Sequence, residues 1–238
     1  MINLDEGFKG KIQFVAVVQE ATEGDRGIEA DGSAADNRGT TAVSSPTLYN
    51  LTMVGSGAAS VNMDNCPIKM REETKAKIYN SIFTDFKGNM AFNADGSLKG
   101  AYALDIDDGA GTAGNLVSDH MLSGQTKISS NIFYGFGKVT GTAPVITDST
   151  KLVKFASGKG WVLDSIIAWG NTFNVDPQLT KITRGTGAID LRPASGSPAL
   201  TGAADIPAGD TFFTSTTYRG AFSATDTWWD WTFTKAVY

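Results

Sequence analysis

Four segments with a shared apolar and β-branched pattern decide the fold: residues 11–17 (KIQFVAV), 47–53 (TLYNLTM), 77–83 (KIYNSIF) and 127–133 (KISSNIF). A second series largely interleaves with them: residues 27–33 (GIEADGS), 67–72 (PIKMRE), 91–97 (AFNADGS) and 103–108 (ALDIDD). Clusters of Gly, Asn, Asp and Ser separate the segments, and helical patterning is nearly absent, which indicates an all-β chain.

The repetition favours stacked coils over a meandering antiparallel sandwich. A sandwich has no reason to repeat one strand type at every second or third position, whereas a solenoid places equivalent strands above one another in parallel sheets. The similarity between residues 28–33 and 92–97 is the sharpest evidence, followed by the Tyr-Asn pairs at Asn50 and Asn80. Asn tolerates a left-handed bend, and stacked Asn side chains hydrogen-bond between neighbouring coils.

Several stretches resemble the right-handed parallel β-helix repeat proteins that bacteria secrete or display on their surface. They are residues 25–31 (DRGIEAD), 46–55 (PTLYNLTMVG), 68–72 (IKMRE), 176–179 (DPQL), 192–199 (RPASGSPA) and 218–222 (YRGAF). The resemblance covers most of the chain from about Gly10 onward. It implies a right-handed parallel β-helix and an extracellular or outer-surface location, but it assigns no chemistry. It also implies further coils upstream, in line with a strand-like run that begins close to Met1.

The chain divides by character at about residue 175. Residues 1–175 are expected to form the coils, including a strand-like segment at 161–167 (WVLDSII), and residues 176–238 a closing segment of the same domain. Trp228, Trp229 and Trp231 predict an irregular aromatic cap over the open hydrophobic end of the coils. An exposed aromatic platform that stacks on sugar rings is the alternative interpretation.

Composition excludes several classes of site. The 238 residues include only Cys66 and His120 as thiol and imidazole, so no internal disulfide and no Cys/His zinc cluster can form. With 20 basic and 25 acidic residues, the chain lacks a broad electropositive surface for nucleic acid. No apolar run approaches the roughly 18 residues of a membrane span. His120 lies in a loop-like stretch without a nucleophile elbow, and Cys66 is expected to be a small buried side chain.

Alternation in the second series predicts a charged strip on the outer face of one sheet. If the apolar side chains point inward, then polar ones point outward. The strip would comprise Glu29, Asp31, Lys69, Arg71, Asn93, Asp95, Asp105 and Asp107. Glu29, Asp31, Asn93 and Asp95 are the candidate binding residues.

Two functional interpretations of this strip compete with a structural one. A polysaccharide lyase would use the carboxylates to hold Ca²⁺ against a uronate, with Lys69 or Arg71 removing the proton. A glycoside hydrolase would need two carboxyl groups flanking the glycosidic oxygen. The structural interpretation is a ladder of cross-strand ion pairs.

The segment 105–115 (DIDDGAGTAGN) is a separate, weak candidate for Ca²⁺. Asp105, Asp107 and Asp108 would supply carboxylate oxygens, with backbone carbonyls completing the shell. The EF-hand spacing is not satisfied, and a solvated loop between coils explains the segment equally well.

The leading hypothesis is a secreted or cell-surface β-helix scaffold without catalysis, acting as a structural, adhesive or filament-forming module. Its expected partners are copies of itself or surface glycans. The alternative is a Ca²⁺-dependent polysaccharide lyase or glycoside hydrolase that acts on an acidic glycan at the charged strip.

Overall fold

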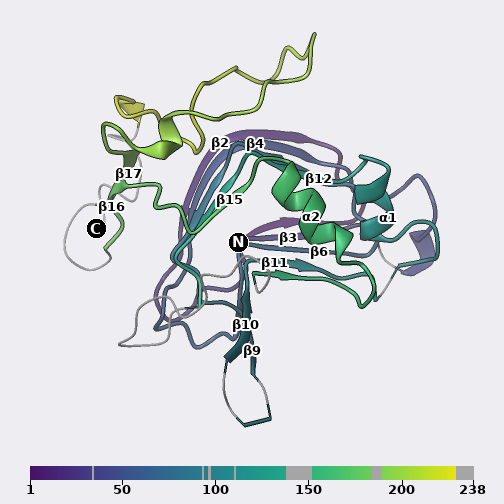
Figure 1. The fold of residues 1–238 in the computed structure, drawn as a ribbon. Helices are drawn as coiled ribbons and strands as arrows, with labels where there is room; N and C mark the ends of the chain where they lie inside the picture. Colours follow the sequence, from purple (N-terminus) through teal and green to yellow (C-terminus); the bar gives the residue numbers. More distant parts are fainter. Residues whose placement is uncertain are drawn as a thin grey trace.

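Two parallel sheets form the body of the molecule. A computed structural model describes residues 1–33, 35–92, 94–95, 98–109, 111–137, 152–183 and 189–228. Sheet A has the order β1 (Ile2–Leu4), β3 (Ile28–Asp31), β6 (Ile68–Arg71), β11 (Leu104–Ile106) and β14 (Val153–Lys154). Sheet B contains β2 (Lys11–Val18), β4 (Thr47–Val54), β7 (Lys77–Tyr79), β8 (Ile82–Thr84), β12 (Lys127–Ser129), β13 (Ile132–Tyr134) and β15 (Thr172–Phe173). The chain passes repeatedly between the two sheets, which face each other across the core (Figure 1).

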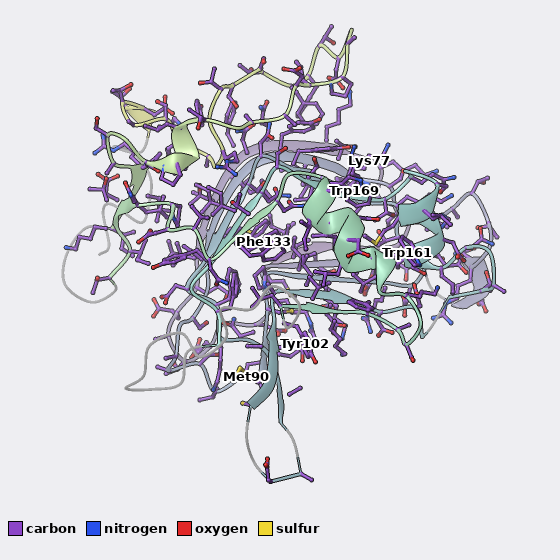
Figure 2. All side chains as sticks on the ribbon, viewed as in Figure 1. Lys77, Met90, Tyr102, Phe133, Trp161 and Trp169 are labelled. Atoms are coloured by element: carbon purple, nitrogen blue, oxygen red, sulfur yellow. The ribbon has the colours of Figure 1, made fainter. Side chains whose placement is uncertain are left out.

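Equivalent residues of successive coils lie side by side, as the repeats predict. In sheet B, Lys11, Thr47, Lys77 and Lys127 occupy one row, and Ile12, Leu48, Ile78 and Ile128 occupy the next. In sheet A, Ile2, Ile28, Ile68, Leu104 and Val153 form an equivalent inward row. Phe83, Phe133 and Phe173 stack between the sheets with ring centroids 5.2 Å apart at each step (Figure 2).

Each coil of sheet B turns the same corner. Phe14, Asn50, Asn80 and Ser130 occupy the corner with positive φ of 52 to 58°. The left-handed conformation predicted for the two Asn residues is therefore confirmed. The residue that follows the corner is buried and bonds to the neighbouring coil: the Leu51 N–H donates to Ser81 Oγ (3.0 Å), the Ser81 N–H to Asn131 Oδ1 (2.8 Å), and the Asn131 N–H to Asn171 Oδ1 (3.0 Å).

The inter-coil ladder is therefore one residue away from the predicted position. Asn50 and Asn80 point to the outside of the corner, where they bind the C-terminal segment. Asn50 Nδ2 donates to the carbonyls of Tyr218 and Gly220, and Asn80 exchanges two hydrogen bonds with the backbone of Ala204. Side chains do bond from one coil to the next, as predicted, but the ladder is formed by the buried Ser81, Asn131 and Asn171 and not by Asn50 and Asn80.

Ala91 and Phe92 belong to β9 (Gly88–Phe92) and not to sheet A, so that part of the sequence interpretation is wrong. β9 pairs antiparallel with β10 (Leu98–Tyr102) and with β5 (Asp64–Asn65), and the hairpin projects from the body (Figure 1). Ala94 and Asp95 lie in a turn. The string Ala-Asp-Gly-Ser suits a turn as well as a strand end, so its similarity to residues 30–33 did not indicate equivalent positions.

Residues 161–167 are helical, which corrects the expected strand. α2 (Trp161–Ala168) buries Val162, Leu163 and Ile166, the spacing of one helical face. It connects β14 to β15 and lies across the space between sheets A and B (Figure 1). The β-branched pair Ile166 and Ile167 suggested a strand, but only Ile166 is buried and Ile167 is exposed, so the helical period of the buried positions was not recognised. α1 (Val117–Leu122) contains His120, which the sequence placed in a loop.

The C-terminal segment lies along the outer face of sheet B. It contains β16 (Leu179–Lys181) paired antiparallel with β17 (Asp190–Pro193), and a short 3-10 helix (Pro198–Leu200). A second 3-10 helix, Ala35–Asn37, lies between β3 and β4. The Trp228 ring stacks on the Phe222 ring with centroids 4.1 Å apart, in a hydrophobic cluster that includes Val54. Trp229 and Trp231 lie outside the described residues. The aromatic end cap and the boundary at residue 175 stay predictions, and no helix in the described part of the chain is long and apolar enough to cross a bilayer.

Replacing Asn131 with Ala should destabilise the protein by about 3 kcal/mol. The side chain is fully buried, accepts from the Ser81 N–H and donates to the carbonyl of Ile78 and to Asn171, and each orphaned buried group costs about 1–3 kcal/mol. Urea unfolding measures this loss, with the partly exposed Asn115→Ala as the matched control. A loss no larger than that of the control would show that the ladder does not hold the coils in register.

Candidate functional site

The outer face of sheet A brings most of the predicted strip together. Asn3, Glu29, Lys69, Asp105 and Lys154 lie in one row across five strands, and Asp31 is paired with Arg71 in the next row. Their neighbours Ile28, Ala30, Ile68, Met70, Leu104 and Ile106 are all buried in the core. The predicted inward and outward alternation is confirmed for these three strands. Asn93 lies outside the described residues and Asp95 lies in the β9–β10 turn.

The carboxylates of this strip are covered by other parts of the chain. Glu29 is 9% exposed, Asp31 4% and Asp105 0%. β5 and the base of the β9–β10 hairpin approach the strip, since Asn89 Nδ2 donates to Asp105 Oδ2 at 3.0 Å and Lys69 Nζ lies 3.8 Å from Asp64. Glu29, Asp31 and Asp105 are therefore buried carboxylates and do not form the open carboxylate surface of a substrate groove, whereas the Arg71 and Lys154 side chains stay partly exposed.

Basic side chains neutralise the carboxylates one by one. Asp105 Oδ2 accepts from Lys154 Nζ at 3.1 Å and lies 3.6 Å from Lys69 Nζ. Arg71 binds both oxygens of Asp31 at 2.7 Å and lies 3.4 Å from Glu29. Arg26 joins the same layer, with Glu29 at 3.4 Å and Asp64 in direct contact. This arrangement matches the structural interpretation, a ladder of cross-strand ion pairs.

The contacts of Arg71 and Lys154 favour the protonated forms of these two side chains, so neither is a good proton acceptor. The hydrogen bond to Asp31 raises the pKa of Arg71 well above its usual range, with Asp31 and Glu29 adding charge attraction. Burial lowers the pKa of Lys154, but charge attraction to Asp105 and the hydrogen bond that Lys154 donates to it outweigh burial, so the pKa is raised. A lyase base must lose its proton near neutral pH, which requires a lowered pKa. Both groups are shifted in the opposite direction.

The predicted Ca²⁺ ligands are directed to different partners. Asp105 belongs to the ion-pair ladder. Asp107 accepts from the Gly109 N–H at 2.8 Å, and Asp108 accepts from Ser118 Oγ at 2.6 Å and from Lys159 Nζ at 3.0 Å. The described part of the chain contains no group of three or more His, Cys, Asp or Glu side chains that would hold a metal ion. The alternative interpretation, a loop between coils, accounts for these contacts.

Glu73 organises this loop, and the sequence interpretation missed it. Its side chain is fully buried at a backbone φ of 67°, and its carboxylate accepts from the N–H groups of Gly39 and Thr112 and from Thr112 Oγ1. Two loops that are distant in sequence are thus tied to one carboxylate. The only sequence signal was an acidic residue within an otherwise strand-flanking stretch, which surface charge explains equally well.

The one His and the one Cys of the chain, His120 and Cys66, are both buried. Burial lowers the pKa of His120, an effect that nearby Lys75 increases and that Glu73 and Asp119 oppose. Burial also raises the pKa of the Cys66 thiol, which is fully enclosed. A buried thiol with a raised pKa is unreactive, so the prediction of a buried structural Cys66 is confirmed.

Stacked parallel strands with in-register rows define a parallel β-helix protein. The family model described as a pectate-lyase-like beta helix domain matches residues 1–154, and the chain belongs to this family. No curated protein and no solved structure gives a significant match. The predicted relationship to parallel β-helix repeat proteins is therefore confirmed.

The Glu73→Gln substitution should cost about 2 kcal/mol at neutral pH, because its amide cannot accept from all three donors and a buried donor left unpaired costs about 1–3 kcal/mol. Burial raises the pKa of Glu73, but hydrogen bonds from Thr112 and Gly39, with the nearby His120, outweigh it and leave the pKa below its ordinary range. Ionised Glu73 therefore stabilises the fold above about pH 4.3, and this contribution declines as the pH falls toward the folded-state pKa.

Urea unfolding of both proteins from pH 6.5 down to pH 3 measures this dependence. The difference in unfolding free energy between wild type and Glu73→Gln should shrink below pH 4.3, whereas the exposed control Glu20→Gln should show no loss at either extreme. A difference of constant size over the whole range would contradict the assigned role of the ionised carboxylate.

Proposed function

We propose that the protein is a non-catalytic β-helix module with a structural or adhesive role. The coils would stack as a right-handed solenoid that presents its loops on a stiff frame. The observation that carries this proposal is the closed ion-pair ladder on sheet A: Asp31 and Asp105, the best placed carboxylates, are buried and already bound by Arg71, Lys69 and Lys154. A substrate would have to displace these pairs before it reached a carboxylate.

The competing function is a Ca²⁺-dependent lyase or a glycoside hydrolase, and the family description is what favours it. A lyase needs a free base together with carboxylates that are open to a metal. A hydrolase needs two carboxyl groups with the glycosidic oxygen between them. The ladder supplies neither, since each of its carboxylates faces a cation of the same protein.

We further propose an extracellular or bacterial outer-surface location, with surface glycans or other copies of the chain as partners. The support is the resemblance of residues 25–31 and 46–55 to bacterial surface β-helix proteins. Edge strands β1 and β2 each have one described neighbour in their sheets, and such edges are natural points of strand addition.

A lyase assay tests the absence of catalysis. Incubation with polygalacturonate or alginate, with and without Ca²⁺, should release no unsaturated uronate, measured by its ultraviolet absorbance. The Lys69→Ala and Arg71→Ala variants should be indistinguishable from wild type in this assay. An absorbance increase that disappears in either variant, while Lys159→Ala retains it, would refute the proposal. Circular dichroism of each variant keeps loss of folding separate from loss of activity.

Sedimentation velocity over a range of concentrations tests self-association. If copies add at the β1 and β2 edges, the sedimentation coefficient should rise with concentration. Replacing the edge residue Val15 with Lys should abolish the rise, because an inserted charge blocks strand addition. A single monomer boundary at the highest concentration would leave glycans as the proposed partners and remove the filament-forming role.

A further inference from the structure

Three lysines gather where β7 and β12 of sheet B begin. Lys77 and Lys127 are direct neighbours in the register of the two strands, and Lys75 precedes Lys77 by two residues. Neighbouring strands lie about 4.8 Å apart, so the two outward side chains start from adjacent points on the sheet surface. We call Lys75, Lys77 and Lys127 the lysine cluster.

Most described cations have an acidic partner, and Lys9, Lys87 and Arg219 instead donate hydrogen bonds to neutral oxygens. Ion pairs engage the following basic residues: Lys11, Arg26, Arg38, Lys69, Arg71, Lys154, Lys159 and Arg192. In the described part of the chain, the ammonium groups of Lys75, Lys77 and Lys127 have neither an ion pair nor a hydrogen bond. Lys127 Nζ lies 5.7 Å from the ring centroid of Trp169, and Lys75 lies near enough to His120 to lower the pKa of its imidazole.

This arrangement costs stability, because like charges directly opposite on neighbouring strands are destabilising. The chain has a net charge of -5 and more acidic than basic residues, so carboxylates are not scarce. On sheet A the same register places Glu29 beside Lys69 and Lys69 beside Asp105. On sheet B the equivalent position repeats lysine. An external anion would relieve the repulsion that the protein itself leaves in place.

The surroundings of the lysine cluster are suited to a carbohydrate. Lys75 and Lys77 line a cavity of about 190 Å³ together with Ser45, Thr47 and Gln125, whose hydroxyl and amide groups both donate and accept hydrogen bonds. Two aromatic rings flank the cluster. Tyr79 is half-buried on the same outer face, two residues beyond Lys77, and one side of its ring stacks on Tyr49 with centroids 4.6 Å apart. Trp169, labelled in Figure 2, follows α2 next to β12.

We propose that the lysine cluster binds the carboxylates of an acidic oligosaccharide, with Ser45, Thr47 and Gln125 bonding its hydroxyl groups and Tyr79 or Trp169 contacting a sugar ring. This inference rests on the proposed function as a binding module and gives it a site and a ligand class. The site lies on sheet B and shares no residue with the charged strip of sheet A. Each ammonium group is a compact charge that donates to a carboxylate without a fixed orientation.

Titration calorimetry at low ionic strength, with a galacturonate oligosaccharide as the probe, tests the site. Wild type should bind the acidic oligosaccharide and show no heat with a neutral galactose oligosaccharide of equal length. Removing one charge-assisted hydrogen bond should weaken binding about tenfold, so Lys77→Gln combined with Lys127→Gln should weaken it about a hundredfold. Affinity should also fall with added salt, because exposed charges are screened.

Lys87→Gln is the matched control. Lys87 is also a surface lysine, but it follows β8 at the other end of the strands and donates to the carbonyl of Ser60. This variant should bind as wild type does. The unfolding midpoint of the Lys77→Gln and Lys127→Gln double variant should be unchanged or higher, because one like-charge pair is removed, so weaker binding would not reflect loss of folding.

Three outcomes would overturn the site. They are unchanged affinity in the lysine double variant, equal affinity for the neutral oligosaccharide, and equal affinity for poly-glutamate, which carries carboxylates without sugar. These outcomes are independent of the proposed function, which fails if unsaturated product is released from polygalacturonate or alginate in the lyase assay. Binding that depends on Lys77 and Lys127 but not on sugar hydroxyls would identify an acidic peptide site instead.

Discussion

The buried polar residue after each corner of sheet B is the constraint on which the rest of the structure depends. Ser81, Asn131 and Asn171 are buried in the interior, and each bonds to the neighbouring coil, besides the bonds of Ser81 to the Tyr79 carbonyl and of Asn171 to the Ile166 carbonyl. A shift of one residue between coils would leave these groups unpaired in an apolar core and would also reverse every inward and outward side chain. The ladder therefore fixes the register, and the register places each row of side chains on the surface.

Much of the coil architecture could be predicted from the sequence because a repeat is a non-local signal. Four segments with the pattern of residues 77–83 imply four equivalent places, whatever the intervening loops do. The prediction failed where a short stretch of sequence is compatible with two kinds of local structure. Phe92, Ala94 and Asp95 carry the sequence of a strand end, yet Phe92 lies in β9 of a hairpin and Ala94 and Asp95 lie in a turn. Residues 161–167 carry β-branched residues whose buried positions follow a helical period.

The candidate site shows a similar division. Alternation correctly placed Glu29, Lys69 and Asp105 on the outer face, because period two follows directly from strand geometry. It did not predict that Asp64 and Asn89 would approach that face, since these contacts depend on the antiparallel pairing of β5 with β9. Glu73 was missed for a related reason: its importance arises from Gly39 and Thr112, which are distant in sequence and have no pattern in common with it.

Both parallel sheets stack their strands in register, but the outward charges alternate in sign in sheet A and repeat in sheet B. In-register stacking brings outward residues of neighbouring coils to within a strand spacing of each other, so the charge at each position determines whether a row attracts or repels. On sheet A, Glu29, Lys69, Asp105 and Lys154 alternate in sign, and the row carries its own counter-charges. On sheet B, Lys77 and Lys127 have the same sign, and neither ammonium group has an ion pair within the described part of the chain. A row with internal partners contributes to the fold, whereas a row without them has electrostatic capacity left for a ligand.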